Sequence, residues 1–107
     1  MANLTDRARA FETQFTQDTE MRFRIEARRN RLLGLWAAEM LGKTGTEADD
    51  YAAAVMRADF EEAGPEDVVR LLVEDLQGHA SEADIRRKLA EMGVQAKAQL
   101  SGQNNVS

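Results

Sequence analysis

An arginine cluster runs directly into a long apolar segment between residues 22 and 41. Residues 22–31 contain five arginines and one glutamate, which gives this window a local charge of +4. Residues 32–41 are almost entirely apolar. At 100° per residue, the segment carries apolar side chains on two sides of a helix, which is typical of a central helix packed against several neighbours. The sequence therefore predicts a long helix at 19–41 that forms the spine of the fold.

The two apolar faces of this helix differ in the size of their side chains. The main face is expected to hold the larger residues Met21, Ile25, Leu32, Trp36 and Met40. The second face is mostly small and comprises Phe23, Ala27, Gly34, Ala38 and Leu41. Gly34 would cost about 1 kcal/mol relative to alanine in an exposed helix. We therefore expect another helix backbone to approach closely at Gly34.

The composition favours an all-α protein with one small domain. The 107-residue chain has one proline, no cysteine and few β-branched residues, and residues with high helix propensity abound. Turns are expected around Gly42, Gly64-Pro65 and Gly78. Together these signals predict a four-helix bundle spanning 19–100, followed by a disordered polar tail at 101–107. The predicted helices are 19–41, 46–62, 65–77 and 82–100.

At the start of two of these helices, a serine or threonine is followed three positions later by an acidic residue. Thr46 precedes Asp49, and Ser81 precedes Asp84. Each pair resembles a capping box, in which side chains satisfy the free N–H groups of the first turn. The apolar stripes of the last two helices also follow helical spacing. They comprise Val68, Val69, Leu72, Val73 and Leu76, and then Ile85, Leu89, Met92, Ala96 and Leu100.

The first 18 residues form a separate segment, here called the arm. Leu4, Ala8, Phe11 and Phe15 follow a four-three-four spacing, so the arm can form an amphipathic helix. This apolar stripe is thin, and an isolated helix of that length is only marginally stable in water. One interpretation is that the arm folds back onto the bundle. The other is a mobile arm that becomes helical in the groove of a partner.

The arginines also allow two interpretations. Arg24, Arg28 and Arg31 lie along one edge of the long helix, and Arg22 and Arg29 lie along the other. In one interpretation, acidic residues of neighbouring helices neutralise them. In the other, they bind the carboxylates of a partner or a phosphate group. The candidate neutralising acids are Asp59, Glu61, Glu62 and Glu66.

Several classes of function are disfavoured by what the sequence lacks. It has no glycine-rich phosphate loop, no serine or cysteine nucleophile with a base, and no histidine–acid cluster for a metal. The single histidine, His79, is expected in an exposed loop. The net charge is −5, which leaves −9 outside the arginine window and disfavours nucleic-acid binding. No apolar signal or membrane-spanning segment is apparent. We therefore expect a cytoplasmic interaction protein, without cofactor or metal, rather than an enzyme.

The arginine-rich motif also carries a resemblance to a known family. From Glu26 to Glu39 and at shorter motifs over residues 4–92, the chain resembles the ζ subunits of alphaproteobacterial F1FO-ATP synthases, small helical proteins that inhibit ATPase activity. The motifs that carry the resemblance are Asp6-Arg7, Phe11-Glu12, Phe15, Glu26-Ala27-Arg28-Arg29-Asn30-Arg31-Leu32-Leu33-Gly34-Leu35-Trp36-Ala37-Ala38-Glu39, Leu41-Gly42, Tyr51-Ala52, Asp59-Phe60, Glu62-Ala63-Gly64, Glu66-Asp67-Val68 and Ile85-Arg86.

This resemblance implies a function for the arm. In the family, the arm becomes helical as it enters an interface between the catalytic α and β subunits of F1, with γ as a further contact, and blocks rotation in the direction of ATP hydrolysis. The protein is then peripheral to the inner membrane through F1 and does not insert into the membrane itself. The residues that would carry this binding are Leu4, Asp6, Arg7, Phe11, Glu12 and Phe15.

The resemblance also implies an alternative function, which is weak binding of ATP or ADP. A small nucleotide-binding regulatory protein would use the arginine-rich helix for the phosphates, because guanidinium groups bind phosphate oxygens in pairs. The candidate residues are Arg22, Arg24, Arg28, Arg29 and Arg31.

Overall fold

The computed structural model describes residues 4–58 and 64–104, with side chains described for 19–58 and 64–102. Within these ranges the chain forms four helices and no strand, which confirms the predicted all-α class. The helices are α1 (Leu4–Met40), α2 (Gly45–Ala58), α3 (Glu66–Asp75) and α4 (Glu82–Asn104).

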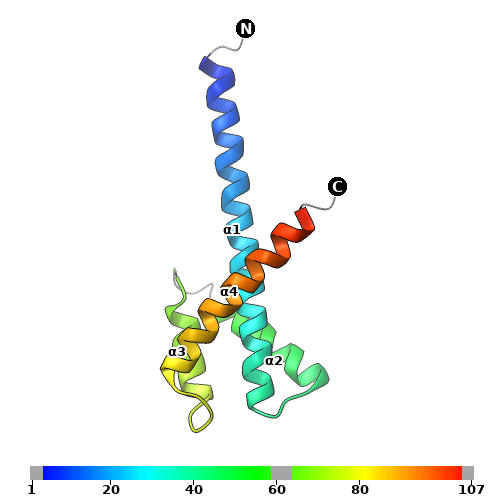
Figure 1. Ribbon diagram of the computed structural model, residues 1–107, viewed down its shortest axis with the longest axis vertical. Helices are drawn as coiled ribbons and strands as arrows, with labels where there is room; N and C mark the ends of the chain where they lie inside the picture. Colours follow the sequence, from blue (N-terminus) through cyan, green and yellow to red (C-terminus); the bar gives the residue numbers. More distant parts are fainter. Residues whose placement is uncertain (1–3, 59–63, 105–107) are drawn as a thin grey trace.

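Helix α1 is much longer than the predicted helix at 19–41, because it begins at Leu4 and includes most of the arm. No glycine or proline occurs between Leu4 and Leu33, so nothing in the sequence stops the helix at residue 18. Its 37 residues correspond to about 55 Å of helix. The N-terminal part of α1 extends away from the other helices and gives the molecule its longest dimension, 64 Å (Figure 1).

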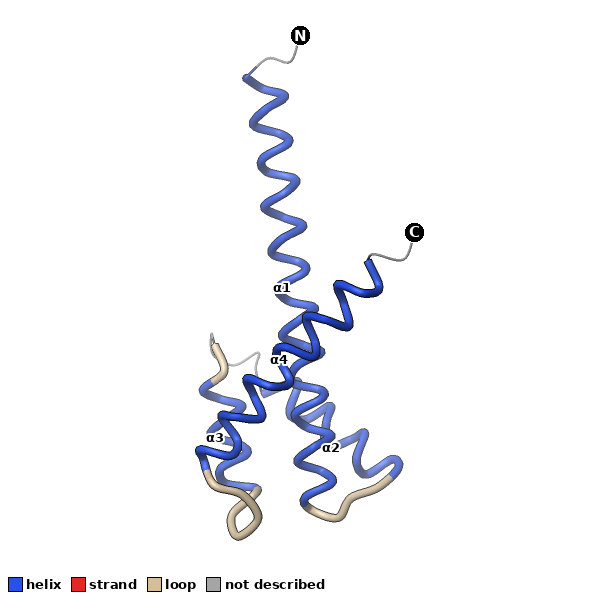
Figure 2. Tube along the Cα trace, in the orientation of Figure 1, coloured by secondary structure: helices blue, strands red, loops and turns tan. Residues whose placement is uncertain are grey.

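The remaining three helices gather around the C-terminal half of α1. Helix α2 returns along α1 after a short turn, and α4 crosses α1 on another side (Figure 2). Helix α3 packs against both α2 and α4. The contacts of α1 with both α2 and α4 confirm that the arginine-rich helix is central.

One apolar cluster connects the four helices. Helix α1 contributes Leu33 and Ala37, and α2 contributes Val55. The stripe predicted for the third helix is buried at Val68, Val69, Leu72 and Leu76, and α4 adds Ile85. In α1 the predicted main face was wrong: Trp36 is only partly buried and Met40 is 36% exposed, whereas Leu33 and Ala37 are fully buried. Residues 32–38 place apolar or small side chains on every side of the helix, so their spacing does not indicate which side faces the core.

Gly34 makes the close helix contact that the sequence predicts. A Cβ atom at this position would lie 2.8 Å from Cα of Ala52 and 3.2 Å from Cβ of Val55. Real Cβ atoms do not approach a backbone atom of another helix so closely, so only glycine fits here without a shift of α2. The absence of a side chain at Gly34 therefore allows α2 to pack directly on the α1 backbone.

The ends of the other helices agree in part with the sequence predictions. The N–H of Asp84 donates to Oγ of Ser81 at 3.1 Å, and the N–H of Ser81 donates to Oδ2 of Asp84 at 3.2 Å, which confirms the second capping box. Helix α2 begins at Gly45, so Thr46 lies inside the first turn rather than before it. Helix α4 continues to Asn104, so residues 101–104 are helical rather than part of a disordered tail. No glycine with positive φ and no proline interrupts that end of the helix.

Candidate functional site

The arm is the first candidate, and the structure describes its backbone from Leu4 onwards as the start of α1. No described residue before Asn30 is fully buried. The predicted partner-binding residues lie outside the described side chains, so their roles remain predictions. They are Leu4, Asp6, Arg7, Phe11, Glu12 and Phe15.

The second candidate is a groove lined by three arginines of α1, here called the arginine groove. Arg24, Arg28 and Arg31 line a cavity of about 530 Å³ together with Ala27 of the same helix. Met56 of α2 and Leu100 of α4 complete the lining. The spacing of four and three residues, which predicted one shared edge, brings these three guanidinium-bearing side chains to one groove where three helices meet.

The other two arginines of the cluster lie elsewhere on α1. The side chain of Arg29 passes over α4, where a Cβ atom on Gly93 would lie 3.7 Å from its Cδ. Its Nε donates a hydrogen bond to Oδ1 of Asn30 at 3.0 Å. Arg22 is exposed and does not line the groove. Three of the five arginines thus line the groove, and the other two do not.

Neutralisation of the groove by acidic neighbours was the competing interpretation. Of the proposed acids, Glu66 instead accepts hydrogen bonds from Arg86 of α4 at 2.9 and 3.2 Å. These bonds hold the pKa of Glu66 below its usual value. Asp59, Glu61 and Glu62 lie outside the described residues. Within the described part of the chain, Arg24, Arg28 and Arg31 form no ion pair.

A buried amide borders the arginine cluster. Asn30 is 1% exposed, and its Nδ2 group has no hydrogen-bond partner among the described residues. A buried donor without a partner costs about 1–3 kcal/mol. The burial of Asn30 could not be predicted from the sequence, because a polar residue between two arginines is expected on a solvent-exposed surface. Asn30 marks the point where α1 passes from the charged surface into the core.

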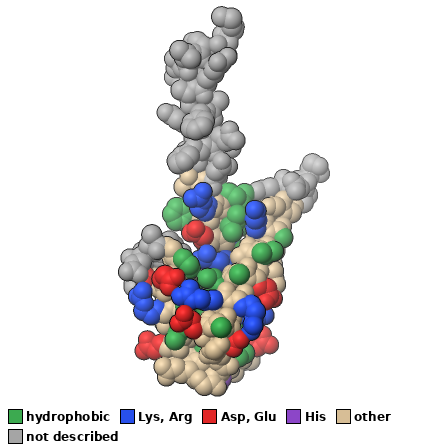
Figure 3. Space-filling view, turned by 60° about the vertical axis from the view of Figure 1, so that its left-hand side comes forward, with side chains coloured by type: hydrophobic (Ala, Val, Ile, Leu, Met, Phe, Trp, Pro, Cys, Tyr) green, Lys and Arg blue, Asp and Glu red, His purple; other side chains and the backbone are tan. Residues whose placement is uncertain are grey.

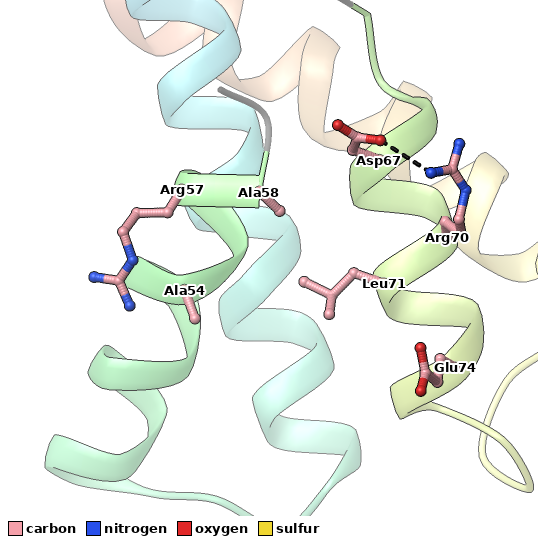
Figure 4. Close-up of a pocket in the computed structure, with 7 residues that line it drawn as sticks. All are labelled: Ala54, Arg57, Ala58, Asp67, Arg70, Leu71 and Glu74. Carbon is pink, nitrogen blue, oxygen red and sulfur yellow. Dashed lines mark hydrogen bonds and ion pairs between the residues drawn. The ribbon is translucent and has the colours of Figure 1, made fainter. Parts of the chain in front are cut away.

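A third candidate is a cavity of about 710 Å³ between α2 and α3 (Figure 4). Its lining combines two arginines and two acids with apolar side chains, and Nη1 of Arg70 pairs with Oδ1 of Asp67 at 3.1 Å. The two arginines and the two acids together have no net charge, so the lining of this cavity gives no preference for a charged ligand. It is lined by Ala54, Arg57, Ala58, Asp67, Arg70, Leu71 and Glu74.

Polar contacts between helices also escaped the sequence predictions. The hydroxyl of Tyr51 in α2 donates to Oδ2 of Asp75 in α3 at 2.8 Å. Burial and this hydrogen bond raise the pKa of Tyr51 well above its usual value. Nζ of Lys88 lies 6.0 Å from the ring centroid of Trp36, so α4 also contacts α1 through a cation–π pair. These contacts stabilise helix packing rather than form a site.

The described residues contain no candidate metal site and no candidate membrane span. Among the described residues, no group of histidine, aspartate and glutamate side chains is arranged to hold a metal ion. None of the described helices contains a stretch that is both long and apolar enough to span a bilayer.

A projecting helix and a basic groove are surfaces of the kind by which a small regulatory protein binds a larger partner. Comparison with known families identifies the regulator: the family described as ATPase inhibitor subunit zeta matches residues 1–99, and the chain belongs to this family. The match begins at the arm and covers α1, α2, α3 and most of α4. It confirms the resemblance that the arginine-rich motif carries.

Solved structures support the same fold. A protein whose structure was determined by solution NMR is 55% identical to the chain and superposes with a TM-score of 0.72. The alignment covers 78% of this chain and 98% of that one. A comparison with curated proteins finds no match.

Proposed function

We propose that the protein is a regulatory, non-catalytic subunit that inhibits ATP hydrolysis by the F1FO-ATP synthase. The observation that carries this proposal is the family match, which includes the arm as well as the helical core. The family concerns inhibition of an ATPase, and a protein that inhibits by occupying an interface needs no catalytic residues of its own. Its partner is the F1 part of the enzyme.

The arm is the part of the molecule best suited to enter F1. In the proposed mechanism, residues 1–18 insert at an interface between a catalytic α and a β subunit, near γ, and obstruct rotation in the hydrolytic direction. Phe11 and Phe15 would contribute about 1.5–3 kcal/mol each if fully buried there. The backbone of α1 supports this proposal, because it extends the arm away from the helices that form the core (Figure 1).

The continuity of α1 gives the arm a rigid base. All fully buried residues of α1 within the described range lie between Asn30 and Ala38. The arm is thus joined to the core through helix rather than through a loop, and the ordering cost of binding is reduced where the helix is already formed. The core can hold the arm at F1 while the arm fills the interface.

The test is inhibition of ATP hydrolysis by purified cognate F1. The full-length protein is expected to lower the rate, and a variant lacking residues 1–18 is expected to leave it unchanged. The truncated protein should keep its α-helical circular dichroism and cooperative unfolding, because no described core residue precedes Asn30.

The matched control is a variant lacking the other terminus, residues 101–107, which should inhibit like the full-length protein. An unchanged rate of ATP hydrolysis by F1 in the presence of the full-length protein would contradict the proposal. Loss of the folded core on removal of residues 1–18 would instead assign the arm to the core.

A further inference from the structure

We propose that the arginine groove is an electrostatic docking site for a carboxylate-bearing segment on the surface of F1, next to the interface that receives the arm. This inference rests on the proposed function, because it takes F1 as the partner. It assigns a second contact, distinct from the arm, to Arg24, Arg28 and Arg31. The arm would block rotation, whereas the groove would guide and hold the protein on the enzyme.

The basic residues of the groove differ from those of α3 and α4 in their partners. Arg24, Arg28 and Arg31 lack any ion pair with the described residues, although most basic side chains of α3 and α4 have one. Arg24 and Arg31 are exposed and Arg28 is half-buried, so all three can reach a ligand. The paired residues are Arg70 with Asp67, Arg86 with Glu66 and Glu82, Arg87 with Asp84, and Lys88 with Glu91.

Positive charge is concentrated in one part of the chain. Outside the window 22–31 the chain sums to −9, so the groove is a local positive site on an acidic protein. In Figure 3, most acidic side chains of this face lie on its lower part, where basic side chains lie among them. Such a local positive site orients the protein towards a negative surface and raises the rate of productive encounters. It also disfavours a long polyanion, which the acidic remainder would repel.

The groove follows the arm directly along α1. Arg24 follows the last residue of the arm by six positions in the same helix, which corresponds to about 9 Å along its axis. When the arm occupies an interface in F1, the groove must therefore lie close to the rim of that interface. Contacts at the rim of an interface act mainly on association rate and salt dependence.

The lining of the groove indicates the kind of segment that fits. From Arg24 to Arg31 it extends about 10 Å along α1, the length of two helical turns. Met56 and Leu100 add apolar surface from two other helices. This combination suits a protein segment with two or more carboxylates flanking an apolar side chain. A lone phosphate group would use the charge but not the length or the apolar surface.

The experiment measures association of full-length protein with immobilised F1 at several salt concentrations. The test variant is Arg24→Gln/Arg28→Gln/Arg31→Gln, and the matched control is Arg57→Gln/Arg70→Gln/Arg87→Gln, which changes the net charge equally. We expect the association rate constant of the test variant to fall roughly tenfold at low salt. Wild type and control should associate at similar rates and lose rate as salt increases, whereas the test variant should be nearly insensitive to salt.

Two further variants separate charge from folding. Arg24→Lys/Arg28→Lys/Arg31→Lys keeps the charge and should retain most of the wild-type association rate. Arg24→Gln/Arg31→Gln changes only exposed residues, so it tests the groove even if replacement of the half-buried Arg28 disturbs the fold. The protein without residues 1–18 should bind F1 weakly in a salt-dependent manner and should not inhibit hydrolysis.

The outcomes distinguish this inference from the proposed function. If wild type inhibits F1 but the test variant associates as fast as the control, the docking site is wrong and the inhibitory function stands. Displacement of the salt-dependent contact by ADP or inorganic phosphate at constant ionic strength would assign the groove to phosphate and overturn the docking proposal. Absence of any binding by the wild type would overturn both.

Discussion

Residues 19–29 and residues 30–38 of helix α1 have the same backbone structure but different surroundings. From Asn30 to Ala38 the helix lies in the core, Leu33, Ala37 and Ala38 are fully buried, and the helices that contact α1 are α2 and α4. Between residues 19 and 29 no side chain is fully buried, and Phe23 is 61% exposed. The difference shows that packing against other helices encloses one part of α1 and leaves the preceding part accessible to solvent.

The comparison also separates stability from binding. Helices of this kind are stabilised mainly by tertiary packing of their apolar side chains rather than by local propensity. Changes in residues 30–38 should therefore reduce the free energy of unfolding. Changes in residues 19–29 should instead act on partner binding.

The sharpest test compares Leu33→Ala with Phe23→Ala. Leu33 is fully buried, so its truncation should lower the free energy of unfolding by about 2–5 kcal/mol through lost burial and a residual cavity. Phe23→Ala should change it by less than about 0.5 kcal/mol. Urea unfolding followed by circular dichroism measures both. Similar destabilisation by the two variants would contradict the division of α1.

Glycines in α1 and α4 provide a second comparison. Gly34→Ala should destabilise the protein by about 1–3 kcal/mol, because the added methyl group meets the backbone of Ala52 at 2.8 Å. Gly93→Ala should be neutral or stabilising by up to about 1 kcal/mol, since its nearest contact is at an ordinary 3.7 Å and alanine favours the helix. Thermal unfolding should place the two variants on opposite sides of the wild type. A stabilised Gly34→Ala variant would show that α2 can move away from α1.

The smallest expected effect concerns the hydrogen bond between Tyr51 and Asp75. Because this is the only tyrosine, its ionisation can be followed by ultraviolet absorbance without interference. The folded state raises the pKa of Tyr51 above its unfolded value of about 10. Its contribution to stability is therefore complete below about pH 10 and is lost as pH rises through the higher folded-state pKa.

We expect the native protein to titrate at higher pH than the same protein in urea. Tyr51→Phe should remove the hydrogen bond at a cost of about 0.5–1.5 kcal/mol near neutral pH. Equal titration midpoints in the native and the urea-unfolded protein would contradict the contact between α2 and α3.

Local signals in the sequence predicted much of the fold. Ser81 and Asp84 were recognised as a capping box, and Gly34 as a site of close helix approach, because each of these features has a stereochemical cause within a few residues. The stripe containing Val68, Leu72 and Leu76 was predicted from its spacing alone. For the same reason, the shared edge of Arg24, Arg28 and Arg31 could be predicted.

Features that depend on packing between distant segments could not be predicted in this way. Nothing in the sequence shows that Tyr51 reaches Asp75, or that Asn30 is buried while Trp36 remains partly exposed. The predicted length of α1 was wrong for another reason: residues 1–18 carry their own thin apolar stripe and were treated as a separate segment, although no glycine or proline between Leu4 and Leu33 ends a helix there. The surface of F1 that would meet the groove lies on another molecule.

The location of the core has a consequence for how this protein can change during evolution. Because the fully buried residues of the described chain all lie from Asn30 onwards, substitutions between residues 19 and 29 are expected to carry little penalty for folding. Under the proposed function, selection can then alter the contacts of this surface with F1 while few compensating changes are needed in the core. Related proteins with the same core are therefore expected to differ more in their affinity for F1 than in their stability.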